Sequence, residues 1–205
     1  MAQTLKSEVR ERMLAAAEAV FGELGYGGAT MAAVAARAGV STGNLYRYFS
    51  SKNDLFHAIV SDDFAASLLQ IVRRRVHSLS QSDLARPNAA ARRDQEELLG
   101  FWIEHRVKVV VLLDRAAGSR FEDFGARFVN ELTKPTLAVL RARCPRRPLP
   151  KVVRFMVREI FENTVRTIVA ILEEHEDEDR IREAFALFWS YQLAGLAGLE
   201  KWVTT

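Results

Sequence analysis

The sequence predicts an all-α protein, in which an N-terminal three-helix domain with a helix-turn-helix is followed by a larger helical domain. Three observations predict this class. Apolar residues recur three or four positions apart along most of the 205-residue chain, as on one face of an α-helix. The segment from Gly27 to Leu55 has the pattern of two short helices joined by a glycine turn. The β-branched run from Val107 to Leu113 suits a buried strand on propensity alone, but no partner strand is visible, so we predict a helix there.

The helix-turn-helix can be assigned residue by residue. Thr30 is placed to cap the first helix, whose residues 31–38 form one apolar stripe. Gly39 supplies the left-handed conformation that ends this helix and turns the chain. Ser41 or Thr42 then caps the second helix.

The second helix carries polar side chains suited to a DNA groove. Leu45 and Phe49 lie four residues apart and are expected to face the core. The outward positions are Thr42, Gly43, Asn44, Tyr46, Arg47 and Tyr48. Asn44 can pair with adenine, tyrosine hydroxyls can reach phosphates, and Arg47 suits a guanine edge or a phosphate. A helix-turn-helix places this helix in the major groove, although an αα-hairpin with a glycine turn also occurs in other all-helical proteins.

The run GNLYRYFSSKNDL, together with the preceding helix and turn, resembles the TetR family of transcriptional repressors. The resemblance covers residues 8–59 and implies a homodimer with an N-terminal DNA-binding domain and a divergent helical ligand-binding and dimerisation domain. By position it implies phosphate contacts from Thr30, Tyr46, Tyr48 and Lys52, and base reading by Thr42, Gly43 and Asn44. Alanines at positions 32 and 33 depart from members with a basic or polar residue there, so base reading is not expected from the first helix. The complete set of predicted DNA contacts is Thr30, Ser41, Thr42, Gly43, Asn44, Tyr46, Arg47, Tyr48 and Lys52.

The predicted domains are residues 1–51, which bind DNA, and residues 52–205, which bind a ligand and dimerise. A helix over residues 7–24 precedes the motif, and one long helix over about 52–80 links the domains. A loop follows at 80–88. Further helices are predicted over about 90–116, 121–143, 151–175 and 179–203, with a bend at Pro135 and a break at Pro145, Pro148 and Pro150.

The last two predicted helices carry apolar stripes, Val152 to Ile171 and Ile181 to Leu199, that exceed what one monomer's core needs. Small residues at 194, 195, 197 and 198 permit close helix approach. Two interpretations remain open at this point: a helical hairpin buried in the monomer, or a four-helix homodimer interface over about 151–203, which the resemblance favours.

A set of aromatic and polar residues lies between these regions. It fits either a packed aromatic core or a cavity for an unknown small-molecule effector. The candidate ligand-binding residues are Phe101, Trp102, His105, Arg106, Phe124, Phe128 and Asn163.

Composition and residue spacing restrict the kinds of function that we expect of this chain. The net charge of +3 is modest for a DNA-binding protein, so positive charge must be placed locally. The histidines lie far apart with no metal-ligand spacing, and no catalytic constellation is visible, so we expect no metal, no cofactor and no enzyme activity. Cys144 is the only cysteine in the sequence, which excludes an intrachain disulfide framework. It lies among arginines, and two interpretations remain open: a redox-responsive thiolate or an inert loop cysteine. The chain shows neither a signal peptide nor a long apolar run, which predicts a cytoplasmic protein with no membrane partner.

The sequence therefore predicts a ligand-responsive, DNA-binding transcriptional regulator, specifically a repressor released from a palindromic operator by a small molecule. The alternative is a helical protein-interaction module, or an activator without small-molecule control.

Overall fold

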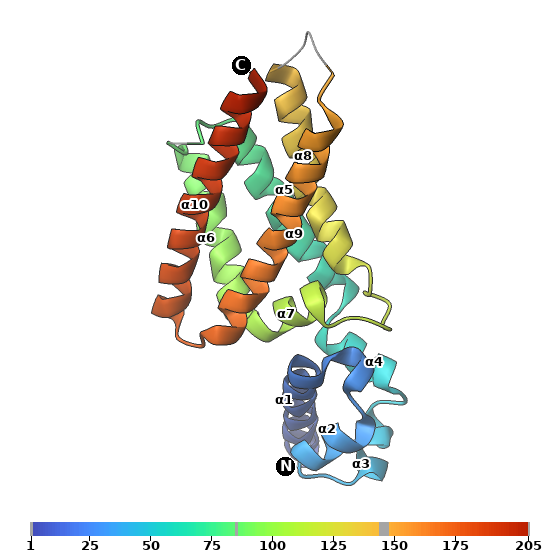
Figure 1. Ribbon diagram of the computed structural model, residues 1–205. Helices are drawn as coiled ribbons and strands as arrows, with labels where there is room; N and C mark the ends of the chain where they lie inside the picture. The colour runs from blue at the N-terminus through green and yellow to red at the C-terminus, as the bar shows by residue number, and fades with distance from the viewer. Residues whose placement is uncertain (1, 85, 144–147, 205) are drawn as a thin grey trace. The chain divides into compact units, whose positions relative to one another are not determined.

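The computed structural model describes residues 2–84, 86–143 and 148–204, with side chains from residue 6 onward. All helices and strands assigned within these residues are α-helices, which confirms the predicted all-α class (Figure 1). Cys144 and Pro145 lie outside the described residues. The helices are α1 (Ala2–Gly28), α2 (Met31–Arg37), α3 (Thr42–Tyr48), α4 (Lys52–Ile59), α5 (Asp62–Ser80), α6 (Ala89–Glu104), α7 (Arg106–Asp114), α8 (Phe124–Arg143), α9 (Lys151–Glu174) and α10 (Glu178–Thr204).

The chain forms two compact units that do not coincide with the predicted domains. The first consists of Met1–Ala66 and Val107–Gly125, and the second of Ser67–Arg106 and Ala126–Thr205. The sequence predicts a boundary at residues 51 and 52, whereas the first unit continues to Ala66 and includes α7. The assignment of DNA binding to residues 1–51 stays a prediction.

Aromatic rings and the apolar helix α7 form the core of the first unit. Phe56 packs edge-on against Phe21 and Tyr26, with ring centroids 5.0 and 4.9 Å apart, and its ring lies 6.3 Å from that of Phe121. In α7 the consecutive residues 109–113 are all buried. A helix that is apolar on every face is stable only when surrounded by protein. Burial therefore explains why this β-branched run forms the helix that the sequence analysis predicts.

Helix α1 is interrupted at Gly25, which has a positive φ of 67°. The backbone N–H of Tyr26 donates to the carbonyl of Arg115, 2.9 Å away, just after the end of α7. A Cβ atom on Gly25 would approach the same carbonyl oxygen to 3.4 Å. Glycine thus supplies both the backbone conformation and the close approach that join the end of α1 to the end of α7.

Two predicted helices are each divided in the structure, so these two predictions are wrong. The predicted linking helix is divided into α4 and α5, because Val60 leaves the helical conformation and the hydroxyl of Ser61 accepts from the N–H of Phe64. The predicted helix over 90–116 is divided at His105, where the backbone has φ −118° and ψ 30°. In both cases the apolar periodicity continues across the break, so periodicity alone does not reveal it.

One segment, Lys52–Ser80, is long and apolar enough by composition to cross a membrane. Half of the residues in the most apolar 18-residue stretch of this segment are buried in the structure. The adjacent carboxylates of Asp62 and Asp63 also lie in the segment. Ionisable groups at the centre of a membrane span are costly. The burial and the break between α4 and α5 fit helices that pack in a protein core.

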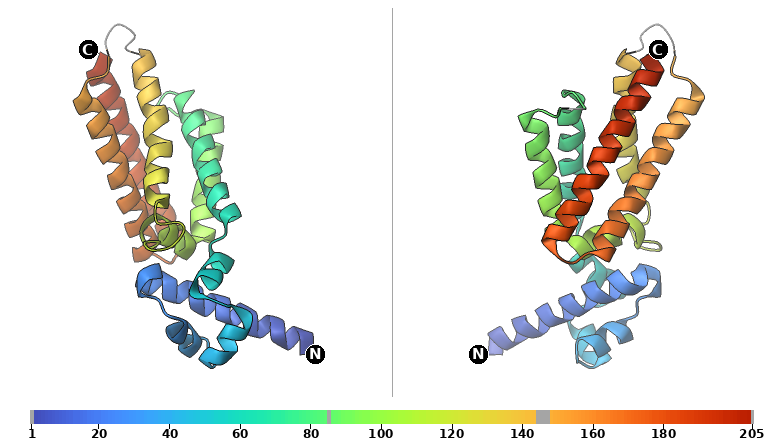
Figure 2. Two further views of the ribbon diagram at one scale, coloured as in Figure 1. Left: turned by 90° about the vertical axis from the view of Figure 1, so that its right-hand side faces the viewer. Right: turned by 60° about the vertical axis from the view of Figure 1, so that its left-hand side comes forward.

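The second unit is a bundle of α5 from Ser67 onward, α6, α8, α9 and α10, which run lengthwise beside one another (Figures 1 and 2). Its core contains an aromatic cluster of Trp102 on α6 with Phe185 and Trp189 on α10. The ring centroids of Trp102 and Phe185 are 4.8 Å apart, and those of Trp102 and Trp189 are 6.0 Å apart. This cluster fixes α10 against α6.

Candidate nucleic-acid interface

Side-chain caps fix the two helices of the predicted motif. The hydroxyl of Thr30 accepts from the N–H of Ala33 at 3.1 Å and begins α2. Gly39 has a φ of 65° and turns the chain after α2. The hydroxyl of Ser41 accepts from the N–H of Asn44 at 3.1 Å, so Ser41 rather than Thr42 caps α3. Each hydroxyl keeps its own proton for a further acceptor such as a phosphate oxygen.

Helix α3 presents one face to the core and the other to solvent. Leu45 and Phe49 are buried, as their spacing predicts. The remaining predicted contact residues on α3 are either exposed, namely Thr42, Gly43, Tyr46 and Arg47, or partly buried, namely Asn44 and Tyr48. A Cβ atom added to Gly43 would meet no other atom within 4 Å. The outer face of α3 is therefore polar and unobstructed, and at Gly43 no side chain projects from it.

Lys52 makes structural contacts that the sequence does not reveal. Its ammonium donates to the carbonyl oxygens of Tyr26 and Ala29, at 2.7 and 3.1 Å, and lies 4.3 Å from the centroid of the Tyr26 ring. Lys52, the first residue of α4, therefore holds the segment that connects α1 to α2 against the start of α4. One of its three N–H groups remains for the predicted phosphate contact.

Lys52→Met is expected to lower the free energy of unfolding by about 1–3 kcal/mol, because two partly buried carbonyls lose a charged donor. Urea denaturation followed by circular dichroism measures this change. Lys151→Met, at an exposed lysine that begins α9, serves as the control and should have little effect. Equal stability of the two variants would contradict the structural role of Lys52.

Arg10 is a basic residue near α3 that the sequence analysis does not single out. Its guanidinium carbon lies 5.5 Å from the centroid of the Phe49 ring, at the end of α3. Its place on α1, more than thirty positions before α3 in the sequence, gives no local indication of this proximity. Arg10 adds an exposed positive charge near the end of α3.

Residues 13–59 match the family described as bacterial regulatory proteins, tetR family. This segment is thus similar to the N-terminal part of TetR-family proteins. The matched segment contains the whole helix-turn-helix and most of the first unit's N-terminal part. Members of this family that resemble the chain are transcriptional regulators, not enzymes.

Curated TetR-family relatives match part of the chain. The HTH-type transcriptional regulator BetI of Escherichia coli O127:H6 (strain E2348/69 / EPEC) is 37% identical over 82 residues, which is 40% of this chain and 42% of BetI. BetI of Escherichia coli (strain K12 / DH10B) is 38% identical over 77 residues, 38% of this chain and 39% of that protein. The chain therefore spans about two fifths of the length of these relatives.

Solved TetR-family structures cover more of the chain at lower identity. A tetR-family transcriptional regulator from Streptomyces coelicolor is 18% identical, with a TM-score of 0.46, and covers 96% of this chain and 88% of its own. A putative TetR-family regulator from Mesorhizobium loti MAFF303099 is 17% identical, with a TM-score of 0.40, and covers 88% of this chain and 96% of its own.

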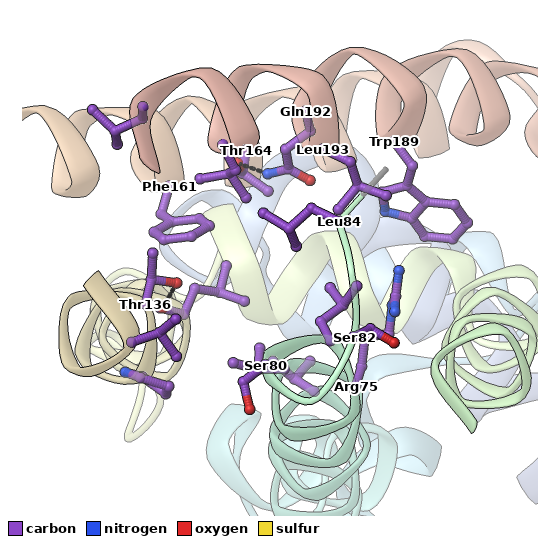
Figure 3. Close-up of a pocket in the computed structure, with 18 of the residues that line it drawn as sticks. Arg75, Ser80, Ser82, Leu84, Thr136, Phe161, Thr164, Trp189, Gln192 and Leu193 are labelled. Carbon is purple, nitrogen blue, oxygen red and sulfur yellow. Dashed lines mark hydrogen bonds between the residues drawn. The ribbon is translucent and has the colours of Figure 1, made fainter. Parts of the chain in front are cut away.

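The second unit contains a cavity of about 130 Å³ (Figure 3). Its wall is mainly apolar, with a few polar groups. Gln192 donates through Nε2 to the hydroxyl of Thr164 at 2.6 Å, and that hydroxyl donates to the carbonyl of Ile160 at 2.9 Å. The polar or charged residues of the wall are Arg75, Ser80, Ser82, Thr136, Arg143, Thr164, Gln192 and Glu200.

The cavity includes two of the seven residues predicted to bind a ligand. Trp102 and Phe128 line it. On α9 it is Thr164 that lines the cavity, whereas the neighbouring Asn163 is exposed and accepts from Arg166. Asn163 therefore does not line this cavity, and its role in ligand binding stays a prediction.

The other predicted ligand residues lie elsewhere. Phe124 is buried in the first unit. The rings of Phe101 and His105 pack edge-on, 4.7 Å apart. Arg106 donates to the carbonyl of Leu172 at 2.9 Å and to the carboxylate of Glu176 at 2.8 Å. The burial of Phe124 and the ring contact of Phe101 with His105 fit the other interpretation of the sequence, a packed aromatic core.

Proposed function

We propose that this chain is a DNA-binding transcriptional regulator that inserts α3 into the major groove. One observation carries the proposal: α3 is anchored from behind by Leu45 and Phe49 while its outer face is polar and unobstructed around Gly43. The family match of residues 13–59 supports it. A short capped helix with this division of faces suits base reading in B-form DNA.

The proposed contacts follow the exposure of each residue. Thr42, Gly43 and Asn44 begin α3 and are assigned to base edges, because the N-terminal residues of a recognition helix approach the bases. Phosphate contacts are assigned to Thr30, Ser41, Tyr46, Tyr48 and Lys52, while Arg47 suits either partner. Phosphate contacts position the helix, and base contacts supply specificity.

A homodimer through α9 and α10 completes the proposal. Both helices expose large apolar side chains: Val152, Phe155 and Met156 on α9, and Leu187, Tyr191 and Trp202 on α10. Tyr191 is 79% exposed and Leu187 is 69% exposed. Neither is in the apolar stripe predicted for this helix, which consists of Ile181, Ala184, Phe185, Phe188, Trp189, Leu193, Leu196 and Leu199. Gly195 and Gly198 lie in the same helix with open space beside them. A second copy of the hairpin would cover this apolar face and explain the small residues.

Repression released by a small molecule is the proposed form of regulation. The cavity among the helices of the second unit supports it, because ligand sites are concave, mostly apolar and furnished with a few polar groups. A ligand can release DNA only by binding more tightly to the dimer conformation whose recognition helices no longer fit successive major grooves. The required spacing is about one helical turn of DNA between half-sites.

Selection of genomic DNA fragments by the purified chain tests the DNA-binding proposal. We expect recovery of a two-fold symmetric sequence, bound with an affinity that falls steeply as salt increases. Sedimentation of the complex should give two chains per duplex. A chain without salt-dependent affinity for any duplex would support the helical protein-interaction module instead.

Asn44→Ala and Tyr46→Phe separate base reading from phosphate contact. Loss of the Asn44 amide is expected to cost about 1–3 kcal/mol at one base pair and to relax the preference there. Tyr46→Phe removes only a hydroxyl and should weaken binding to all duplexes by a similar factor. Affinities for a panel of single-base operator variants measure both effects. Identical specificity profiles for the two variants would contradict the assignment.

A further inference from the structure

Arg10 places an exposed positive charge against the end of α3. Its guanidinium carbon lies over the ring of Phe49, 5.5 Å from the ring centroid. Phe49 is buried and ends α3, where its N–H donates to the carbonyl of Leu45 at 3.0 Å. A cation over an aromatic face is attracted by the ring. Phe49 therefore holds the Arg10 guanidinium beside α3 in the free chain.

The charge of Arg10 is not balanced by a neighbouring carboxylate. In the same unit the guanidinium of Arg37 pairs with Glu23, and that of Arg120 pairs with Asp62, both at 2.6 Å. Arg10 forms no ion pair and no side-chain hydrogen bond with any residue that the structure describes; its one side-chain interaction there is with the Phe49 ring. An arginine side chain carries five N–H donors. Those of Arg10 are available to an external acceptor.

Lys6 adds a second positive charge on the same face of α1. It precedes Arg10 by four residues, so the two side chains are neighbours on the helix surface, and both are exposed. The other neighbouring positions on this face are Ser7, Met13 and Leu14, none of which is acidic. Like charges at this spacing destabilise a helix by about 0.2–0.5 kcal/mol. A polyanion beside this face would offset the repulsion.

The dimensions of B-form DNA indicate which part of the duplex would meet Arg10. The major groove is about 12 Å wide, and a helix with its side chains is about 10–12 Å in diameter. If α3 occupies the groove, it fills the width, and a group beside α3 faces the phosphates that border the groove. Figures 1 and 2 show the N-terminal end of α1 at the same end of the first unit as α2 and α3. The position of Arg10 beside Phe49 thus suits a phosphate and not a base edge.

We propose that Arg10 binds a backbone phosphate at the edge of the major groove that α3 enters, and thereby fixes α1 against the duplex. A guanidinium can donate two parallel N–H groups to the oxygens of one phosphate. The inference rests on the proposed function, because it requires α3 in the groove. It makes Arg10 a positioning residue, which adds affinity for every sequence and specificity for none.

Arg10→Gln tests this contact through the salt dependence of DNA binding. Each phosphate that a cationic side chain neutralises contributes about 0.9 to the slope of log affinity against log salt concentration. Fluorescence anisotropy measures the affinity of the full chain for a labelled duplex, recovered by genomic selection, at several salt concentrations. We expect Arg10→Gln to bind about tenfold more weakly at low salt. The slope should fall by about 0.9 for each bound chain, and the preference among single-base variants should stay the same.

Arg12→Gln is the matched control, because Arg12 is exposed on the same helix and carries the same charge. Two residues along a helix of 3.6 residues per turn differ by about 200° around its axis, so Arg12 points away from Phe49. The control should keep the wild-type slope. Arg10→Lys should retain the slope as well, because it restores the charge. Thermal unfolding of each variant measures the contribution of the Phe49 contact to stability, which a merely structural role would change without changing the slope.

Duplexes with one phosphate replaced by a neutral methylphosphonate locate the contact. At one phosphate in each half-site the replacement should weaken binding of the wild type but not of Arg10→Gln, since the two changes remove the same interaction. An unchanged slope in Arg10→Gln, an equal fall in Arg12→Gln, or additive losses at every methylphosphonate would overturn the inference and leave the proposed function intact. A wild-type chain that binds no duplex would overturn both.

Discussion

Gly43→Leu is expected to lower the affinity for operator DNA by about 100-fold or more while the fold is retained, a change of at least about 2.7 kcal/mol. A side chain at this exposed position meets no protein atom within 4 Å, and the backbone there does not have a positive φ. Leucine also favours a helix over glycine by up to about 1 kcal/mol. The free protein therefore accepts the substitution. In the complex the new side chain occupies the space where α3 would approach the base edges.

Fluorescence anisotropy with a labelled operator measures this loss, and thermal unfolding measures stability. Ala90→Leu is a matched control, because Ala90 is the second residue of α6 and is exposed, as Gly43 is the second residue of α3. The control should bind DNA as the wild type does. Full operator affinity in Gly43→Leu would mean that α3 does not enter the groove.

Gly198→Leu is expected to weaken self-association by about 100-fold or more without destabilising the single chain. Gly198 is exposed, and a Cβ there meets nothing within 4 Å, so packing inside the chain does not require a glycine. A glycine within a helix costs about 0.5–1 kcal/mol relative to alanine. Close approach by the hairpin of a second copy explains it, and a leucine would prevent that approach.

Analytical ultracentrifugation over a range of concentrations measures the shift from dimer to monomer. The same variant should lose affinity for a duplex with two half-sites and retain the weak affinity for a single half-site, because α3 is unchanged. Ala90→Leu again serves as the control. If Gly198→Leu dimerises as tightly as the wild type, then Gly198 does not pack closely against a second copy in the dimer interface.

The parts of the fold that follow local rules could be predicted from the sequence. Thr30, Gly39 and Ser41 act through backbone groups within three or four residues, so caps and turn can be assigned from the pattern alone. The burial of Leu45 and Phe49 follows from their spacing. The same local signals gave the exposed polar face of α3.

Features that depend on distant residues could not be predicted in this way. The ammonium of Lys52 bonds carbonyls at positions 26 and 29, and the choice of Thr164 over Asn163 for the cavity wall depends on how α9 is rotated. Apolar periodicity continues past Ser61, whose hydroxyl nevertheless caps α5. The spacing of apolar residues along a helix identifies which residues share a face, but it does not identify the helix against which that face packs.

The discontinuous first unit has a consequence for protein engineering. Residues 1–66 alone would lose Phe121 from beside Phe56, and Tyr26 would lose the carbonyl of Arg115. A chimaera that transplants the proposed DNA-binding region onto another protein must therefore carry residues 107–125 with it. Exchange of the N-terminal segment by itself would leave apolar surface on both the donor and the recipient, and such hybrids should aggregate.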